Sequence, residues 1–467
     1  MSVYQIETSL PVSTFFYRKK EKDYLQVCPN GKLVPVSQSN AVAAMVTEGI
    51  IPKGLPENVL KMEADPILYH IRCDAALDYD GPMPGYAVGL HRENEQQLYC
   101  TAGAVLPTKE LAKAPFGSSW PTIYELLRRL LISDETGEDQ LLTFLAAMKL
   151  SQEVLQQALD PVTPGTSRSI RPGQAIVLVG PLNCGKSFLI EWVVRPLLGG
   201  RLVDAFKAFT ADPDGFNGEL LNGEVWFIDD QESSTDMRQR MKLSAHVKSK
   251  LYGAAVGFHS KYKTPITIKP FGRLFICCND TEENLSVLPP LKPDIMDKIH
   301  LFRCNKAESP MPTRTEKERE AYRNQIAQEL PFMAGELEAW KIPSKYQADR
   351  SGVKTYMNPW IVDKLRAQAP ETSLADLILT AFDKGNLTGN SWKGSARELE
   401  NIIKSPTFSQ WRQADRLLNW ARATGTYLGR IVDNHEAFLE DVGLEVLRSG
   451  QKKGVEQYSI QDRRKKE

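Results

Sequence analysis

The sequence lacks the features of membrane and secreted proteins. It has no run of about 18 or more apolar residues, so no membrane-spanning helix is predicted. Its first residues, Met-Ser-Val-Tyr-Gln-Ile-Glu, include neither a basic segment nor an apolar core, so no secretory signal peptide is expected. We therefore expect a cytoplasmic protein with no membrane partner.

Paired metal ligands and paired cysteines are also absent. The seven cysteines are an odd number with no C-x-x-C pair, and the six histidines are scattered. This argues against a zinc site and against a disulfide framework. Cys277 and Cys278 lie within an apolar run, where cysteine behaves as a small hydrophobic residue. Unpaired cysteines of this kind fit a protein in a reducing compartment.

The chain has no excess of charge of either sign. Lysine and arginine number 58, and aspartate and glutamate also number 58. Any nucleic-acid binding must therefore come from local basic clusters rather than from a global field. Apolar residues make up 42% and charged residues 25%, which is ordinary for a globular protein, and 467 residues suffice for about two to four domains.

One stretch, residues 174–187, carries the strongest chemical information. An apolar strand, Ala175–Val179, leads into G-x-x-x-x-G-K-S, and an apolar helical run, Phe188–Leu198, follows. Such a loop points backbone N–H groups at phosphates, while Lys186 reaches the β- and γ-phosphates and Ser187 ligates Mg²⁺. A chance glycine turn does not explain the strand and helix on either side. ATP and Mg²⁺ are the expected cofactors, and the predicted nucleotide-binding residues are Gly180, Pro181, Leu182, Asn183, Cys184, Gly185, Lys186, Ser187 and Phe188.

A second apolar strand, Val225–Asp229, ends in two carboxylates. Placed beside the strand that precedes the phosphate loop, it would bring Asp229 to the Mg²⁺ ion. Asp230, or as a weaker choice Glu232, would then polarise the attacking water. We therefore predict Asp229 as a metal ligand and Asp229 and Asp230 as catalytic residues.

A third apolar strand, Leu274–Cys278, leads into Asn279. An amide at this position suits a hydrogen bond to the γ-phosphate or to the attacking water. Taken alone, Asn279 is better explained as a turn residue after a strand. The catalytic interpretation depends on the two motifs described above.

Between these strands lies a basic segment. Residues 236–251 are predicted as a basic helix, and residues 256–268 have the pattern of a β-hairpin. Lys261 and Lys263 lie near its tip with a tyrosine between them, and His259 precedes them. This pattern is typical of contacts with single-stranded DNA, where phosphates meet lysines and bases stack on aromatic rings. An exposed hairpin with solvated lysines is the alternative.

The remaining chain is divided by its composition. Residues 1–120 are expected to form a mixed α/β region, mostly irregular over 73–85. There Asp78 and Asp80 fit a turn better than a metal pair, so no primase site is assigned. Residues 121–165 are predicted as a helical collar and linker, 166–310 as the core, and 311–360 as a helical connector whose helix from Glu316 is ended or kinked by Pro331.

The last part, residues 361–467, has the pattern of a winged helix. Helices are predicted over 395–404 and 411–424, followed by a hairpin over 444–460 with a basic tip. This tip and the basic residues 463–466 suit contacts with DNA phosphates. Solvated lysines explain the same residues equally well.

The order of these motifs resembles the superfamily 3 helicases, which are AAA+ motors of small DNA viruses, phages and plasmids. Four further pieces are similar to primase–helicase proteins of phages and other mobile elements: residues 216–217, 270–273, 279–280 and 288–290. The resemblance spans about residues 170 to 460. It implies an α/β fold with an AAA+ P-loop NTPase core and a C-terminal winged helix.

The resemblance also implies an activity, namely ATP-dependent DNA unwinding or translocation in replication of a mobile element. The motor would be a ring, a homo-hexamer, moving 3′→5′ with single-stranded DNA in its central channel. Lys186, Asp229, Asp230 and Asn279 would be catalytic, and the hairpin would contact DNA. Any primase or polymerase would be a separate chain.

The same family places a basic residue of one subunit at a neighbour's ATP, within Asp-Arg-x-x-x-Phe. In this sequence Lys298 occupies that position, which is a departure because lysine lacks the planar fork of arginine. Arg273 and Arg303 are the alternative candidates. The identity of this trans-acting finger stays open.

Two other functions compete with the motor. A non-motor AAA+ switch or scaffold ATPase would use nucleotide state to control assembly with a partner, for example in phage defence. Such a switch has no need for the lysines of the hairpin. A small-molecule kinase explains the phosphate loop but not the paired acids, the Asn279 strand or the C-terminal region.

Overall fold

The structure is a computed structural model of the 467-residue chain, and it describes residues 15–19, 21–28, 33–111, 113–160, 169–210, 215–229, 237–261, 264–306, 308–433 and 435–464. The chain forms two compact units, residues 1–358 and 359–467. Among the predicted site residues, Asp230, its alternative Glu232, and Lys263 lie outside the described residues. No helix in the described ranges is both long enough and apolar enough to cross a membrane.

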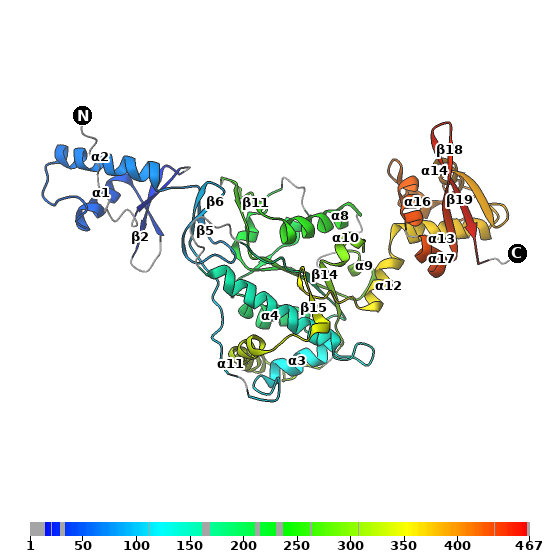
Figure 1. The fold of residues 1–467 in the computed structure, drawn as a ribbon, viewed down its shortest axis with the longest axis horizontal. Helices are drawn as coiled ribbons and strands as arrows, with labels where there is room; N and C mark the ends of the chain where they lie inside the picture. The colour runs from blue at the N-terminus through cyan, green and yellow to red at the C-terminus, as the bar shows by residue number, and fades with distance from the viewer. Residues whose placement is uncertain are drawn as a thin grey trace. The chain divides into compact units, whose positions relative to one another are not determined.

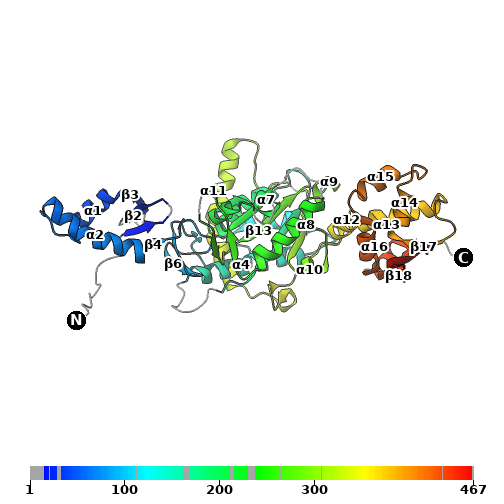
Figure 2. The ribbon, with the colours of Figure 1, turned by 90° about the horizontal axis from the view of Figure 1, so that it is seen from above.

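Residues 15–77 form a four-stranded sheet with two helices. The elements are β1 (Phe15–Arg18), β2 (Asp23–Val27), β3 (Leu33–Val36), α1 (Gln38–Thr47), α2 (Glu57–Asp74) and β4 (Ala76–Leu77). The strand order is β3-β2-β1-β4, and only the β1–β4 pair is parallel. Helices α1 and α2 lie beside these strands (Figure 2). Phe15, Tyr24, Met45 and Leu68 are buried in their shared core.

A second sheet follows directly. It contains β5 (Tyr79–Gly81), β6 (Gly89–Glu93) and β7 (Gln96–Cys100) in the order β5-β7-β6. The expectation that residues 73–85 are mostly irregular is therefore wrong in part, because β4 and β5 lie there. Strands of two or three residues are too short to show a period of two, and β1 and β7, distant in sequence, hold them in place.

Asp78 and Asp80 flank the start of β5 rather than sitting in the turn that the sequence favours. Asp78 accepts a hydrogen bond from the Gln97 amide at 2.9 Å and pairs with Lys19 at 2.8 Å. Asp80 lies 3.8 Å from Arg18. Each carboxylate thus already faces a cation of the protein.

The central sheet has five parallel strands (Figure 1). They are β8 (Ala175–Val179), β9 (Leu202–Asp204), β10 (Val225–Asp229), β13 (Arg273–Cys278) and β14 (Ile299–Arg303). The order is β14-β8-β13-β10-β9. All residues of β8 and β13 are buried, as expected for parallel strands covered on both faces. This confirms a mixed α/β fold with a parallel sheet.

Short helices and one hairpin connect these strands. They are α5 (Lys186–Leu189), a π-helical turn η2 (Ile190–Val194), α6 (Arg195–Leu197), α7 (Phe206–Thr210), η3 (Gly218–Asn222), α8 (Met237–His246), a π-helical turn η4 (Val247–Leu251), β11 (Val256–Phe258), β12 (Ile266–Ile268), α9 (Glu282–Leu285) and α10 (Pro293–Met296). Strands β11 and β12 pair antiparallel, so the sequence-predicted hairpin is present. Helix α8 and η4 together cover most of the predicted basic helix.

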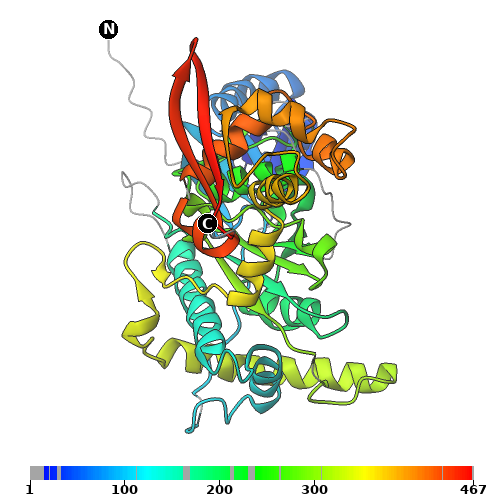
Figure 3. The ribbon, with the colours of Figure 1, turned by 90° about the vertical axis from the view of Figure 1, so that its right-hand side faces the viewer.

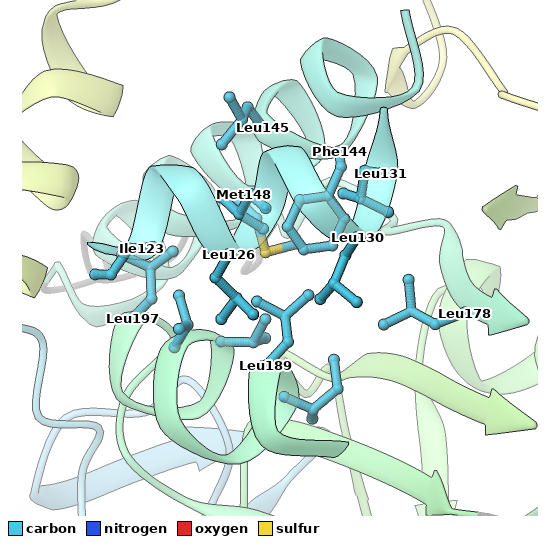
Figure 4. Packing of buried hydrophobic residues seen from close by; sticks show 14 of the residues in the cluster. Ile123, Leu126, Leu130, Leu131, Phe144, Leu145, Met148, Leu178, Leu189 and Leu197 are labelled. Carbon is cyan, nitrogen blue, oxygen red and sulfur yellow. The ribbon is translucent and has the colours of Figure 1, made fainter. Parts of the chain in front are cut away.

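Three long helices pack on the phosphate-loop side of the sheet. They are α3 (Pro121–Leu131), α4 (Asp139–Leu159) and α11 (Glu316–Ala339). Helix α11 lies across α3 and α4 (Figure 3). Figure 4 shows Leu126 and Leu130 of α3 and Met148 of α4 gathered near Leu189, within one buried cluster. These helices therefore share the core of the sheet, while a collar over residues 121–165 stays a prediction.

We expected Pro331 to end or to kink helix α11. The helix does not end there, and a kink at Pro331 stays a prediction. Proline removes one backbone donor, yet the apolar face continues past it from Leu330 to Met333 and Leu337, all buried in the same cluster. The Pro331 carbonyl accepts a hydrogen bond from the Glu110 amide at 3.1 Å. Tertiary packing on both sides of Pro331 holds the helix together.

After α11 the first unit ends with small elements, η5 (Ser344–Tyr346), β15 (Gln347–Ala348) and β16 (Gly352–Val353). The second unit contains α12 (Pro359–Ala367), α13 (Pro370–Asp383), β17 (Ser391–Ser395), α14 (Ala396–Ile403), α15 (Trp411–Leu417), α16 (Ala423–Asp433), α17 (His435–Val442), β18 (Leu444–Lys452) and β19 (Val455–Asp462). Its antiparallel sheet has the order β17-β19-β18.

The predicted helix over 411–424 is two helices, α15 and α16. The break coincides with Arg422, whose φ of 67° lies in the left-handed region that a continuing helix excludes. Strands β18 and β19 form the expected hairpin. Lys453 and Gly454 join them, and both have positive φ, which matches the twist of a tight hairpin turn.

Candidate functional site

The loop between β8 and α5 is shaped by two glycines. A side chain at Gly180 would lie 2.5 Å from the Cys304 carbonyl oxygen, so only glycine fits there. Gly185 has φ of 105° and immediately precedes α5, and Asn183 adopts φ of 59°. The backbone thus curls back at the carboxyl edge of the sheet and delivers the helix N-terminus to that edge.

Lys186 is the first residue of α5 and is almost fully buried. Its Nζ donates hydrogen bonds to the carbonyls of Gly180 at 2.8 Å and Pro181 at 2.9 Å. It also donates to Oδ1 of Asn279 at 3.3 Å. Two predicted catalytic residues, Lys186 and Asn279, are therefore in direct contact, which sequence spacing does not reveal.

Ser187 and Asp229 meet at the same edge. The Ser187 hydroxyl donates to Oδ1 of Asp229 at 2.8 Å. A hydroxyl and a carboxylate are the hard oxygen donors that Mg²⁺ takes in proteins, so this pair fits the expected metal. The structure thus brings together the two residues predicted as metal ligands.

The route to this contact differs from our expectation. We placed the Asp229 strand beside β8, whereas β13 lies between β8 and β10. The two residues still meet because Ser187 lies on α5, which follows the loop after β8, and its hydroxyl reaches Asp229 at the end of β10. Asn279, which follows the intervening strand, consequently lies on the Lys186 side.

The other loop residues behave differently from one another. The Leu182 side chain is exposed, whereas Cys184 is buried against the helices on this face. The Phe188 ring stacks on Tyr322 of α11, with centroids 4.7 Å apart. The Phe188 side chain therefore packs behind the loop, and any contact of Phe188 with a nucleotide would be made by its backbone.

Helix α3 supports the loop from behind. A side chain at Gly185 would lie about 4 Å from Leu126 and Leu130 of this helix. At its start, the buried Glu329 carboxylate of α11 accepts from the amides of Thr122 at 3.2 Å and Ile123 at 2.9 Å. A negative group at a helix N-terminus offsets its partial positive charge. The loop is thus held by a helix that is itself capped.

Two of the three finger candidates lie at the amino edge of the sheet, away from the loop. Arg273 begins β13 and is buried, and it donates to Ser151 at 3.2 Å and to the carbonyls of Gly272 and Arg171. Burial lowers the pKa of Arg273 to about 10. Lys298 precedes β14 and donates to Asp297 at 2.6 Å and to the Asp294 carbonyl at 2.8 Å. Both side chains are buried and hydrogen-bonded within their own chain.

Arg303 ends β14 at the carboxyl edge, paired in register with Val179 just before the loop. Its guanidinium is about one-third exposed and lies 3.4 Å from the exposed Glu135. Gln140 fixes its backbone by accepting from the Arg303 amide at 2.9 Å. Of the three basic candidates, Arg303 is the one beside the phosphate loop of its own chain.

The hairpin β11–β12 is held on both strands near the end where the connecting loop begins. Asn217 accepts from the His259 amide at 2.8 Å. On the other strand, Gln96 accepts from the Thr267 amide at 3.0 Å and donates to the Pro265 carbonyl at 3.1 Å. His259 and Lys261 are exposed. The side chains from β6–β7 that hold this hairpin carry no motif, so the sequence did not indicate them.

Comparisons with known proteins add a fold but no family. A model described as a family of unknown function (DUF5906) matches residues 178–288, less than half of the chain. No curated protein matches the sequence. An apo structure of the NrS-1 C-terminal region (305–718) shares 13% identity, covers 96% of each chain and has a TM-score of 0.50. This likeness shows a shared fold and nothing further.

Two other solved structures resemble the chain less closely in space. An A-form apo structure of the NrS-1 C-terminal region has 13% identity, covers 96% of each chain and has a TM-score of 0.49. The JCV helicase bound to a small molecule has 13% identity, covers 56% of this chain and 69% of its own, and has a TM-score of 0.26. At these scores neither supports an argument about this protein.

Proposed function

We propose that the chain is an ATP-dependent DNA helicase or translocase of the superfamily 3, AAA+ type, acting as an oligomeric ring in replication of a mobile element. The observation that carries the proposal is the convergence of Lys186, Ser187, Asp229 and Asn279 at the carboxyl edge of the parallel sheet. Ligands of open α/β sheets bind outside this edge.

Each residue has a distinct task at this edge. Lys186 exchanges its carbonyl partners for the β- and γ-phosphate oxygens, and the backbone amides of the loop hold the remaining oxygens. Ser187 and Asp229 hold Mg²⁺, whose charge offsets that of the phosphates. Asn279, already beside Lys186, orients the attacking water. Asp230 is the proposed base.

A ring requires a group that acts between subunits, and we propose that this group is none of the three basic candidates. Arg273 and Lys298 are occupied at the amino edge. Arg303 borders its own phosphate loop, so we assign it to the phosphates of its own chain. The trans-acting residue therefore lies among residues that the motif comparison did not single out.

The DNA contact is assigned to the hairpin β11–β12. Asn217 and Gln96 hold the two strands near the start and end of the connecting loop, and Lys261 is exposed within that loop. A loop that is held at both of its ends and carries an exposed lysine suits a contact with the phosphate backbone of one DNA strand. In the second unit, the β18–β19 hairpin and its helices are proposed as a winged helix that contacts DNA phosphates.

The test is the rate of ATP hydrolysis with and without single-stranded DNA, at two salt concentrations, with the mass in solution measured in the same buffer. We expect stimulation that weakens with salt, in a ring-sized assembly. Strand-displacement assays with 3′ and 5′ tails then give the direction, expected as 3′→5′. A slow rate that ignores DNA in a monomeric protein would contradict the motor and favour the switch ATPase.

The hairpin is tested by the double variant Lys261→Ala with Lys263→Ala. It should keep its basal ATPase rate and lose stimulation by DNA, because the variant removes phosphate contacts only. Lys317→Ala with Lys341→Ala is the matched control, since it removes the same charge from exposed positions elsewhere. An unchanged response in the hairpin variant would remove the hairpin from the mechanism.

A further inference from the structure

A cavity of about 440 Å³ lies where the two N-terminal sheets meet. Residues of β1, β2 and the end of α2 line one side of it, and residues of β6 and β7 line the other. Its volume falls within the range of about 300 to 1,000 Å³ that small-ligand sites occupy. Among the described residues, none of the phosphate loop or of the β11–β12 hairpin lines it. The cavity is therefore separate from the site proposed for ATP hydrolysis.

The side formed by β6 and β7 is organised by the register of the two strands. Leu90 pairs with Tyr99, and Arg92 pairs with Gln97. Residues two apart on a strand face the same side, so the two cross-strand pairs share one face of the sheet. All four residues line the cavity. This side consequently has an apolar end, at Leu90 and Tyr99, and a polar end, at Arg92 and Gln97.

Two aromatic rings meet at the apolar end. The ring of Phe16, from β1, lies against that of Tyr99, with centroids 5.3 Å apart and an angle of 58° between the planes. Both rings are held in the core of the N-terminal sheet, whereas Leu90 beside them is 43% exposed. Burial raises the pKa of Tyr99, so its hydroxyl stays protonated. This end thus offers a fixed aromatic and apolar surface to a planar ring.

The polar end holds a cation that no other side chain neutralises. Arg92 is exposed, and within the described part of the chain it has no ion pair or hydrogen bond. The Gln97 side-chain amide donates to the Asp74 carbonyl at 3.4 Å, which brings the end of α2 to this place. The Asp74 carboxylate is itself paired with His70 at 2.6 Å. An anionic group of a ligand can therefore pair with the Arg92 guanidinium.

We propose that this cavity binds a nucleoside phosphate, with its base against the Phe16–Tyr99 ring pair and its phosphate at Arg92. Three observations carry the assignment: the aromatic end, the guanidinium at the other end, and a volume of small-ligand size. The sugar lies between them, where Gln97 and Asp74 offer oxygen acceptors to its hydroxyls. A ligand without an anionic group would leave Arg92 unused.

A free nucleotide and one nucleotide of a single strand share this chemistry. Base stacking on an aromatic ring and a phosphate held by a basic side chain are the contacts through which proteins bind single strands without reading their sequence. The same contacts hold a soluble nucleotide. The assignment goes beyond the proposed ATP hydrolysis and does not depend on it.

The experiment is photochemical cross-linking of the full-length protein. 5-Iodouracil forms covalent bonds with aromatic rings next to it under ultraviolet light. One arm uses 5-iodouridine monophosphate, and the other uses a short single-stranded oligonucleotide with one 5-iodouracil. We expect peptide mapping by mass to place a cross-link on Phe16 or Tyr99. A cross-link with the monophosphate identifies a free nucleotide as the ligand, and one with the oligonucleotide alone identifies a strand.

The phosphate contact is tested by Arg92→Glu. The variant replaces the cation by an anion at an exposed position, so it should fold and should lower the cross-linking yield in the cavity by about tenfold or more. Arg314→Glu is the matched control, since it makes the same charge change at another exposed position, and its yield should equal that of wild type. An Arg92→Glu yield equal to that of the control would overturn the placement of the phosphate.

The aromatic contact is tested by Tyr99→Leu, with Tyr99→Phe as the conservative variant. Leucine keeps an apolar side chain but removes the flat ring, so the Kd of the cross-linking ligand in equilibrium dialysis should rise about fivefold or more. Phenylalanine keeps the ring and should leave the Kd within about twofold. Thermal unfolding shows that each variant is folded. Equal Kd values for the leucine variant and wild type would overturn stacking on Tyr99.

Failure of this site and failure of the proposed function are distinguishable. Lys186→Ala should keep the cross-link in the cavity, because that site does not use the phosphate loop. A cavity cross-link in a protein without ATPase activity would uphold the cavity site and contradict the proposed function. Cross-links confined to the phosphate loop or to the β11–β12 hairpin, or no cross-link from either probe, would overturn the cavity site.

Discussion

The two edges of the central sheet both collect buried polar side chains, yet they differ in what those side chains contact. At the amino edge, Gln174 contacts His300 at 2.9 Å and Thr355 at 2.7 Å, and Arg273 and Lys298 are similarly occupied by the protein. At the carboxyl edge, Lys186 donates to the Gly180 carbonyl at 2.8 Å, and Ser187 donates to Asp229 at 2.8 Å.

This difference shows that burial and charge alone do not identify a nucleotide-binding site. Lys186 and Lys298 are almost equally buried, at 7% and 8% exposed. Only Lys186 stands where backbone amides and a helix N-terminus converge, because helices that follow parallel strands begin at the carboxyl edge. The amino edge lacks that convergence, so its polar groups serve the fold.

The largest effect is expected from Lys186→Ala. ATP hydrolysis should fall by about 100-fold or more, because the variant removes a cation placed for the developing phosphate charge. The measurement is the steady-state ATPase rate of protein shown to be folded by circular dichroism. An undiminished rate would contradict the site.

Lys298→Ala is the matched control at the other edge. It removes an equally buried amine, so it should lower the free energy of unfolding while leaving the ATPase rate per folded molecule within about two-fold of wild type. Urea unfolding and ATPase assays on the same preparation separate the two quantities. If Lys298→Ala lowered the ATPase rate as much as Lys186→Ala does, the assignment of ATP hydrolysis to the carboxyl edge alone would be wrong.

A smaller effect is expected from Asp229→Asn, which weakens one metal ligand but keeps its shape. The Mg²⁺ concentration for half-maximal ATPase activity should rise about tenfold or more, because a neutral amide holds a divalent cation less well than a carboxylate. Titration of the ATPase rate with Mg²⁺ gives this value. An unchanged titration would exclude Asp229 from the metal site.

For stability, Arg273→Met should lower the free energy of unfolding by about 2 kcal/mol, since Ser151 and two carbonyls lose their donor inside the protein. It also removes the guanidinium from the Phe271 ring, 4.3 Å away. Urea denaturation measures the change. If ATP hydrolysis disappears while stability is kept, Arg273 acts in catalysis after all.

The smallest effect is expected from Glu135→Ala at the carboxyl edge. Its ion pair with Arg303 is exposed, so the free energy of unfolding should change by less than about 1 kcal/mol.

Arg303→Ala should instead reduce ATP hydrolysis about tenfold if Arg303 contacts phosphate. If Glu135→Ala and Arg303→Ala lowered the ATPase rate equally, hydrolysis would depend on the Glu135–Arg303 ion pair and not on Arg303 alone.

The sequence by itself determined the local units. The apolar runs of β8, β10 and β13 are long and uniform, and the spacing of glycine, lysine and serine fixes a loop whose geometry depends on few residues. The β11–β12 and β18–β19 hairpins were likewise predictable from alternating residues and turn residues. These features rest on contacts within about 20 residues of chain.

Only the tertiary structure decided what the polar residues face. Strand order placed β13 between β8 and β10, packing carried α11 through Pro331, and distant strands created β4 and β5. In the sequence, Arg273, Lys298 and Arg303 are all basic residues at the end of an apolar strand, and nothing separates them. The strand directions in the sheet place Arg273 and Lys298 at the amino edge and Arg303 at the carboxyl edge. Those outcomes depend on contacts between segments far apart in the chain, which no local pattern encodes.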